Sequence, residues 1–117
     1  MTAAIQNRRS HARADTTLGC KILRPAVARY LSARTADVSA GGALLDIDTT
    51  RPLIEGEEIE IGVAWTGTGL LSTRDLVTAR VVRTDPLHEN RQQVAVKFAR
   101  VQAPAAQVVE QVATQAA

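Results

Sequence analysis

The sequence has few aromatic residues and a single cysteine. One Phe, one Tyr and one Trp occur among 117 residues, so a surface that stacks several nucleic-acid bases on aromatic rings is not expected. Cys20 alone cannot form an internal disulfide, and the start, MTAAIQNRR, lacks the apolar segment of a signal peptide. No apolar run approaches the length of a membrane-spanning helix. We therefore expect a cytoplasmic protein without membrane insertion.

The chain also lacks the residue combinations that catalysis and metal binding require. His11 and His88 are its only histidines, and neither has a second ligand candidate beside it. The sequence offers no Ser–His or Cys–His arrangement, and its glycines at 67 and 69 do not form a phosphate loop before a helix. Cys20 lies in an alternating run and is predicted to be a small core residue. A binding module without a cofactor or metal is favoured over an enzyme.

Positive charge is concentrated in the first third of the chain. Residues 1–34 carry seven basic groups and one acidic group, or +6, while residues 35–117 carry seven basic and eleven acidic groups, or −4. An anion would be steered toward the N-terminal third. The alternative is a set of solvated charges on strand edges.

Apolar and polar residues alternate in most of six runs, as in half-buried strands. The runs are 17–23, 27–36, 43–47, 59–65, 70–83 and 93–98. The second run is irregular: we expect Val27, Leu31 and Ala33 on one face, with Arg29 exposed at a bulge or edge. Short turns without helices between the runs predict an all-β, antiparallel sheet that closes into a small six-stranded barrel. Pro104 and the apolar stripe behind it, which includes Val108 and Val112, predict a C-terminal helix. The expected organisation is a flexible leader over 1–13, a barrel over 14–102 and a helix over 103–117.

Two short motifs provide the candidate ligand site. Arg9 and Arg13 form an Arg-x-x-x-Arg pair with Arg8 directly in front, and Asp37-Val38-Ser39-Ala40-Gly41-Gly42 follows 24 residues after Arg13. Arginine forks match the O6/N7 edge of guanine and phosphate oxygens, and a carboxylate accepts from the N1 and N2 hydrogens of guanine. Gly41 and Gly42 can adopt unusual backbone angles and admit a ligand to the main chain. The alternative is a hairpin turn whose Asp and Ser satisfy local amides.

Both motifs, in this order, resemble those of the PilZ domain, a bacterial receptor module for cyclic di-GMP. The resemblance implies a six-stranded antiparallel split barrel with an appended helix, and a ligand covered by the N-terminal arginine loop. It assigns ligand binding to Arg8, Arg9, Arg13, Asp37, Ser39, Gly41 and Gly42. An arginine at the position of Arg8 is associated in the family with an intercalated pair of ligands, so two molecules per chain are expected.

The sequence leaves two kinds of function open. In one, cyclic di-GMP orders the leader and the reshaped surface signals to a protein partner, which the sequence does not identify. In the other, a PilZ-like barrel acts as a protein-interaction module independently of nucleotide, through the stripe with Val108 and Val112. RNA or DNA binding is disfavoured, because aromatic residues are few and the last two thirds of the chain are acidic.

Overall fold

The computed structural model describes residues 13–65, 76–102 and 104. Its elements are β1 (Arg13–Ala14), β2 (Gly19–Arg24), the 3₁₀ turn η1 (Pro25–Val27), β3 (Arg29–Ser39), β4 (Gly42–Asp48), β5 (Glu58–Val63), β6 (Val77–Thr84) and β7 (Arg91–Phe98). No helix within these ranges is long and apolar enough to cross a membrane. The predicted leader, apart from Arg13, and the predicted helix, apart from Pro104, fall outside the described residues.

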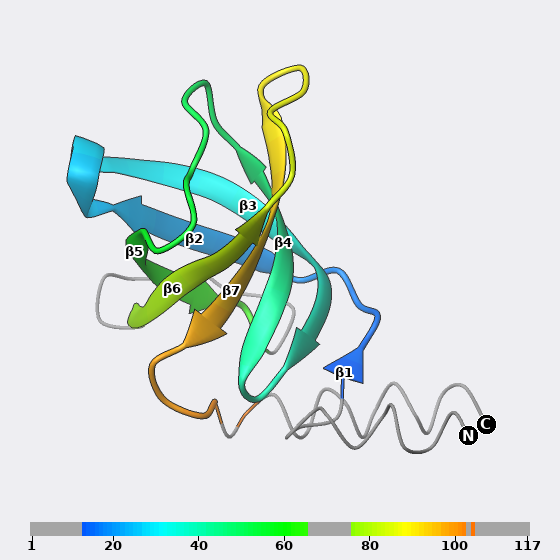
Figure 1. The fold of residues 1–117 in the computed structure, drawn as a ribbon. Helices are drawn as coiled ribbons and strands as arrows, with labels where there is room; N and C mark the ends of the chain where they lie inside the picture. Colours follow the sequence, from blue (N-terminus) through cyan, green and yellow to red (C-terminus); the bar gives the residue numbers. More distant parts are fainter. Residues whose placement is uncertain (1–12, 66–75, 103, 105–117) are drawn as a thin grey trace.

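Six antiparallel strands form a closed barrel (Figure 1). The sheet runs in the order β3-β2-β5-β6-β7-β4, and β4 pairs with β3 again and closes the circle. The two-residue strand β1 is added beside the C-terminal end of β3. The prediction of an all-β, six-stranded antiparallel barrel is therefore confirmed.

The barrel interior is packed with aliphatic side chains, as the alternation predicts. The six largest fully buried side chains are isoleucine or leucine: Ile22, Leu45, Ile47, Leu53, Ile59 and Ile61. Each such side chain stabilises the fold by about 1.5–3 kcal/mol when fully buried. Aromatic residues contribute at one edge, where the rings of Trp65 and Phe98 meet edge to face with centroids 6.3 Å apart. A core of this kind needs few aromatic residues.

Strand β3 differs from its prediction at both ends. Val27 belongs to η1 rather than to the strand, because Pro25 begins a 3₁₀ turn that Ala28 ends in the left-handed region, with φ 53°. Arg29 is exposed, as expected, but it is simply the first residue of β3. The bulge lies at the other end, where the pairing with β4 shifts between Thr35 and Asp37. The strand continues through Ser39, beyond the predicted end at residue 36.

The long loop between β4 and β5 is held on the barrel by two polar side chains. Arg24 forms a two-pronged ion pair with Glu57, and each of these side chains is only 8% exposed. Arg24 also donates to the carbonyls of Arg51 and Pro52, at 2.8 and 2.9 Å. The amide of Gln92 accepts from the Leu53 N–H and donates to the Leu53 carbonyl. These bonds fix the loop across one end of the barrel.

Candidate functional site

The turn between β3 and β4 carries the Asp/Ser/Gly motif and is closed by Ser39. The Ser39 hydroxyl accepts from the N–H groups of Gly41 and Gly42, at 3.3 and 3.2 Å, and donates to the Gly42 carbonyl at 3.2 Å. Only 4% of Ser39 is exposed. The hydroxyl therefore builds the hairpin, in the way that the alternative interpretation of the motif describes for Ser39.

Gly42 is required by a close approach between strands. A Cβ atom at this position would lie 2.3 Å from the carbonyl oxygen of Val96 on β7, which is far inside a normal contact. The φ angle of Gly42 lies outside the left-handed region that favours glycine. The expectation that Gly42 supplies an unusual backbone angle is therefore wrong. Residue 42 is a glycine because the main chains of β4 and β7 approach too closely at this point to admit a side chain.

The bulge in β3 sets the direction of Asp37. Ala33 and Thr35 point into the barrel, and continued alternation would send the side chain of residue 37 inward as well. The extra residue at Ala36 reverses the alternation, so that Val38 is buried and Asp37 is half-buried on the outer side. A carboxylate thus reaches the surface beside the turn without entering the apolar core.

The end of the N-terminal leader lies next to this turn. In β1, Arg13 pairs with Ser39 and Ala14 pairs with Val38. The chain that follows is held by Thr35, whose hydroxyl accepts from the Leu18 N–H at 2.8 Å and donates to the Thr16 carbonyl. The Thr35 N–H also donates to the Leu18 carbonyl, at 2.9 Å. The fold therefore brings the main chain of Arg13 to the motif.

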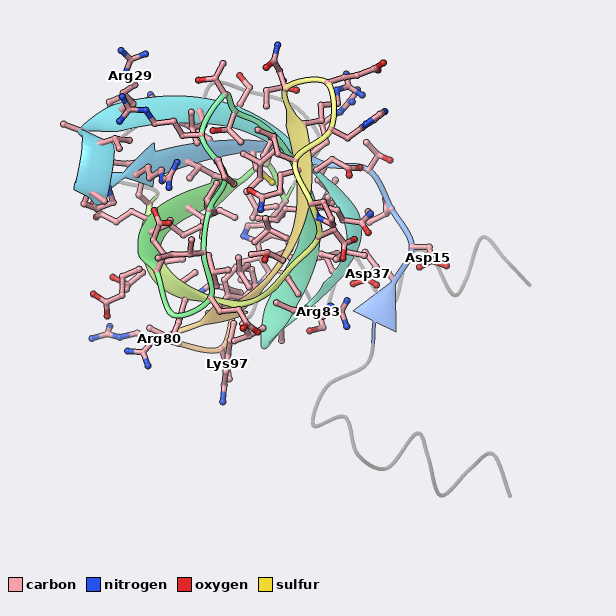
Figure 2. The ribbon with its side chains drawn as sticks, turned by 45° about the horizontal axis from the view of Figure 1, so that its top comes forward. Asp15, Arg29, Asp37, Arg80, Arg83 and Lys97 are labelled. Atoms are coloured by element: carbon pink, nitrogen blue, oxygen red, sulfur yellow. The ribbon has the colours of Figure 1, made fainter. Side chains whose placement is uncertain are left out.

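Of the residues assigned to the site from the sequence, five lie together. They are Arg13, through its main chain, and Asp37, Ser39, Gly41 and Gly42. Arg8 and Arg9 lie outside the described residues. Figure 2 shows Asp37 and Asp15 on the side of the barrel that carries β1.

Two cations near the turn were not singled out from the sequence. Lys97 on β7 is the Cα partner of Gly42, and Arg80 on β6 is in turn the partner of Lys97. Both side chains are exposed. Lys97 places positive charge on the outer surface next to the motif, which suits an anionic ligand, whereas Arg80 forms an exposed ion pair with Glu58 at 3.7 Å. Only strand register reveals them, because Lys97 is 55 positions from Gly42 in the sequence.

The segment after β7 is attached to the same turn. The Phe98 N–H donates to the Gly41 carbonyl at 2.9 Å, and the Gln102 N–H donates to the Ala40 carbonyl at 2.7 Å. Of the two residues between the hairpin strands, Gly41 is thus bonded to the last residue of β7 and Ala40 to the segment that follows it. A change in the conformation of the turn would therefore alter its hydrogen bonds to Phe98 and Gln102.

The described residues show no alternative reactive centre. Cys20 is buried in β2, and burial raises the pKa of its thiol to about 12, so the thiolate is scarce at neutral pH. Its prediction as a small core residue is confirmed. Within 13–65, 76–102 and 104, no group of three or more His, Cys, Asp or Glu side chains is placed to hold a metal ion.

These features define a small β-barrel module in which one hairpin turn gathers a polar motif, the end of the leader and the C-terminal segment. The family model of the PilZ domain matches residues 7–115. The chain therefore belongs to the PilZ domain family, and the resemblance inferred from its two motifs is confirmed. Among curated proteins, none matches the chain significantly.

Solved structures with the same fold include proteins from two bacteria. The PilZ domain of YcgR from Escherichia coli with c-di-GMP has a TM-score of 0.66 at 19% identity, covering 93% of this chain and 94% of that one. The Bacillus subtilis inhibitor of motility MotI/DgrA has a TM-score of 0.64 at 15% identity, covering 93% and 51%. YcgR from Escherichia coli in complex with c-di-GMP has a TM-score of 0.56 at 19% identity, covering 93% and 44%. The chain thus spans about half the length of MotI/DgrA and less of the longer YcgR chain.

Proposed function

We propose that this PilZ domain is a receptor for cyclic di-GMP that signals to a protein partner. The observation that carries the proposal is the pairing of β1 with the end of β3, which brings the main chain of Arg13 directly opposite Ser39. Two PilZ structures that share the fold are complexes with c-di-GMP. The chemistry of the residues agrees, since it suits a compact anionic guanine nucleotide.

In this proposal the charged residues bind the ligand, and the small residues shape the surface on which it lies. Arg8, Arg9 and Arg13 supply guanidinium forks for guanine edges and phosphates, and Asp37 accepts from the guanine N1 and N2 hydrogens. Ser39, Gly41 and Gly42 hold the turn against β7, as their bonds and contacts indicate. Lys97, the Cα partner of Gly42, adds positive charge beside this surface. With Arg8 present, two ligand molecules are proposed to bind each chain.

In this proposal the C-terminal segment transmits the ligand-induced change in the turn to the protein partner. The end of β7 is bonded to the Gly41 carbonyl and Gln102 to the Ala40 carbonyl, so a ligand that shifts the turn also shifts the path of the chain beyond Gln102. The partner would recognise that altered path or the ordered leader. MotI/DgrA, which has the same fold, is an inhibitor of motility. Its activity is a property of a chain about twice as long.

Isothermal titration calorimetry with cyclic di-GMP tests the site. Arg9→Ala and Asp37→Ala should each weaken binding by about 1–3 kcal/mol, roughly 5- to 150-fold, because each removes a guanine or phosphate contact. Asp46→Ala is the matched control, since Asp46 lies on neighbouring β4 and pairs with Arg34 rather than with the motif. Cyclic di-AMP and GTP should bind weakly. Equal affinity of wild type, Arg9→Ala and Asp37→Ala would refute the assignment.

A pull-down separates this proposal from a nucleotide-independent interaction module. With cyclic di-GMP, capture of the partner should change, and with Asp37→Ala that change should disappear. Capture that is the same with and without nucleotide, for both proteins, would favour the interaction module.

A further inference from the structure

The end of the barrel opposite the motif turn contains an open pocket of about 650 Å³. Its walls come from η1, the first residues of β3, the end of β4 with the loop behind it, and the turn before β7. Arg29 and Ser39 are the first and last residues of β3. Ten residue steps of strand separate them, or about 33 Å. The lining of the pocket includes none of Asp37, Ser39, Gly41 and Gly42, so the pocket is separate from the motif turn.

Two arginines give this pocket uncompensated positive charge. Arg29 on β3 and Arg51 in the loop after β4 both line it, and among the described residues neither has an ion-pair partner. The other charges there are already matched. Arg24 is paired with Glu57, and the Asp48 carboxylate lies 3.4 Å from the Nε of Arg91. An anion entering the pocket would meet two unmatched guanidinium groups.

Cross-strand pairing places Arg29 beside an arginine whose charge is already neutralised. Arg24 and Arg29 are direct Cα partners in the β2–β3 pair, and Glu57 is paired with Arg24. The guanidinium of Arg29 is therefore the cation of this pair that an anion can still neutralise. Figure 2 shows Arg29 projecting outward from the start of β3, at the tip of the β2–β3 hairpin.

The main chain around the pocket is firmly held. Glu89 and Asn90 have positive φ as the two central residues of the turn between His88 and Arg91, and Ala28 has positive φ where it ends η1. The Thr49 hydroxyl donates to the Arg51 carbonyl at 2.7 Å and accepts from the Arg51 N–H at 3.2 Å. The Arg51 side chain therefore extends from a fixed point.

We propose that this pocket binds a small organic phosphate, a ligand that combines a phosphate dianion with a compact apolar part. Arg29 and Arg51 would hold the phosphate from two sides. Ala26, Val27 and Leu31 supply an apolar wall for the remainder of the molecule. A volume of about 650 Å³ is typical of small-molecule sites and exceeds what a bare phosphate fills. The site is independent of cyclic di-GMP binding.

An NMR titration of the ¹⁵N-labelled full chain with phenyl phosphate tests the proposal. Saturable shifts are expected at the amides of Val27, Leu31 and Thr50, while those of Ala40 and Gly42 stay in place. Shifts at the motif turn alone would overturn this site without touching the proposed function. Inorganic phosphate should bind several-fold more weakly than phenyl phosphate, and equal affinity would overturn the organic part of the proposal.

Two variants and a matched control assign the contacts. Arg29→Ala and Arg51→Ala should each weaken phenyl phosphate binding by about tenfold, as loss of one charge-assisted fork requires. Arg34→Ala is the control, because Arg34 is exposed on the same strand but faces outward between the buried residues Ala33 and Thr35. Unchanged titrations in both pocket variants, or an equal loss in the control, would overturn the proposal. The thermal midpoints of all three variants verify that they are folded.

Discussion

The two ends of the β3–β4 pair are built from different chemistry. At the motif end, a neutral hydroxyl, a glycine and main-chain bonds hold the turn: Ser39 caps it and Gly42 lies against the Val96 carbonyl. At the opposite end, a buried ion pair holds the long loop: Arg24 and Glu57 are paired in two places. The contacts of the Ser39 hydroxyl and of Gly42 at the first end involve no ionised group, whereas the loop at the second end depends on the pairing of Arg24 with Glu57.

This difference shows that the role of an arginine in this chain follows from its neighbours. Arg24 is buried and fully bonded, so it is a structural residue. Arg29 is its cross-strand neighbour but has no ion-pair partner among the described residues, so it is suited to a ligand. The +6 charge of residues 1–34 therefore serves at least two separate regions of the barrel.

The charged end should be the more sensitive to loss of one partner. Glu57→Gln leaves the Arg24 guanidinium buried without a counter-charge, which should lower the free energy of unfolding by about 3–5 kcal/mol. Urea denaturation of wild type and variant measures this difference in the free energy of unfolding. Glu58→Gln is the control: its ion pair with Arg80 is exposed and 3.7 Å long, so the loss should stay below about 1 kcal/mol. Similar losses in both variants would contradict a structural role for the buried pair.

The stability of the motif end should depend on the size of the residue at position 42. Gly42→Ala places a methyl group against the Val96 carbonyl, so strands β4 and β7 must separate, and stability should fall by about 1–3 kcal/mol. Gly19→Ala is the control, because no atom lies within 4 Å of the added Cβ, and its effect should stay within about 0.5 kcal/mol. Thermal unfolding compares them. If Gly42→Ala is as stable as Gly19→Ala, the close approach of the strands does not constrain this position.

The smallest expected effect lies at the junction between the leader and the motif. Thr35→Val keeps the shape but leaves the Leu18 N–H and the Thr16 carbonyl without the hydroxyl, which should cost about 1–2 kcal/mol. Because that bond positions the end of the leader, affinity for cyclic di-GMP should fall about threefold or more. Calorimetry on Thr35→Val measures this. A destabilised variant with unchanged affinity would show that the leader is positioned by other contacts.

Much of the fold could be predicted because strand alternation depends on local sequence. Ile59 and Ile61 alternate with polar neighbours and are buried in β5 as expected. The bulge at Ala36 could not be predicted, since it depends on pairing with β4, and Ala36 resembles its neighbours. Strand β2 ends at Arg24, one residue beyond the predicted run 17–23, but the burial of Arg24 could not be predicted, because its partner Glu57 is 33 positions away.

The position of the candidate site could be proposed from the sequence, but the contacts that hold its turn could not. The two motifs indicate which residues gather, and the pairing of Arg13 with Ser39 places part of that set at one turn. The reason for Gly42 was missed, because it lies in the carbonyl of Val96 on a distant strand. Register with β7 also determines the position of Lys97, which no local pattern marks.

The bond from Gln102 to Ala40 has a further consequence for regulation. If a partner protein draws residue 102 away from the turn and thereby weakens the ligand, then the ligand must weaken that partner by the same factor, since the two equilibria share one cycle. Measuring nucleotide affinity in the presence of the partner would then report the strength of the signal itself, without any assay of the downstream process.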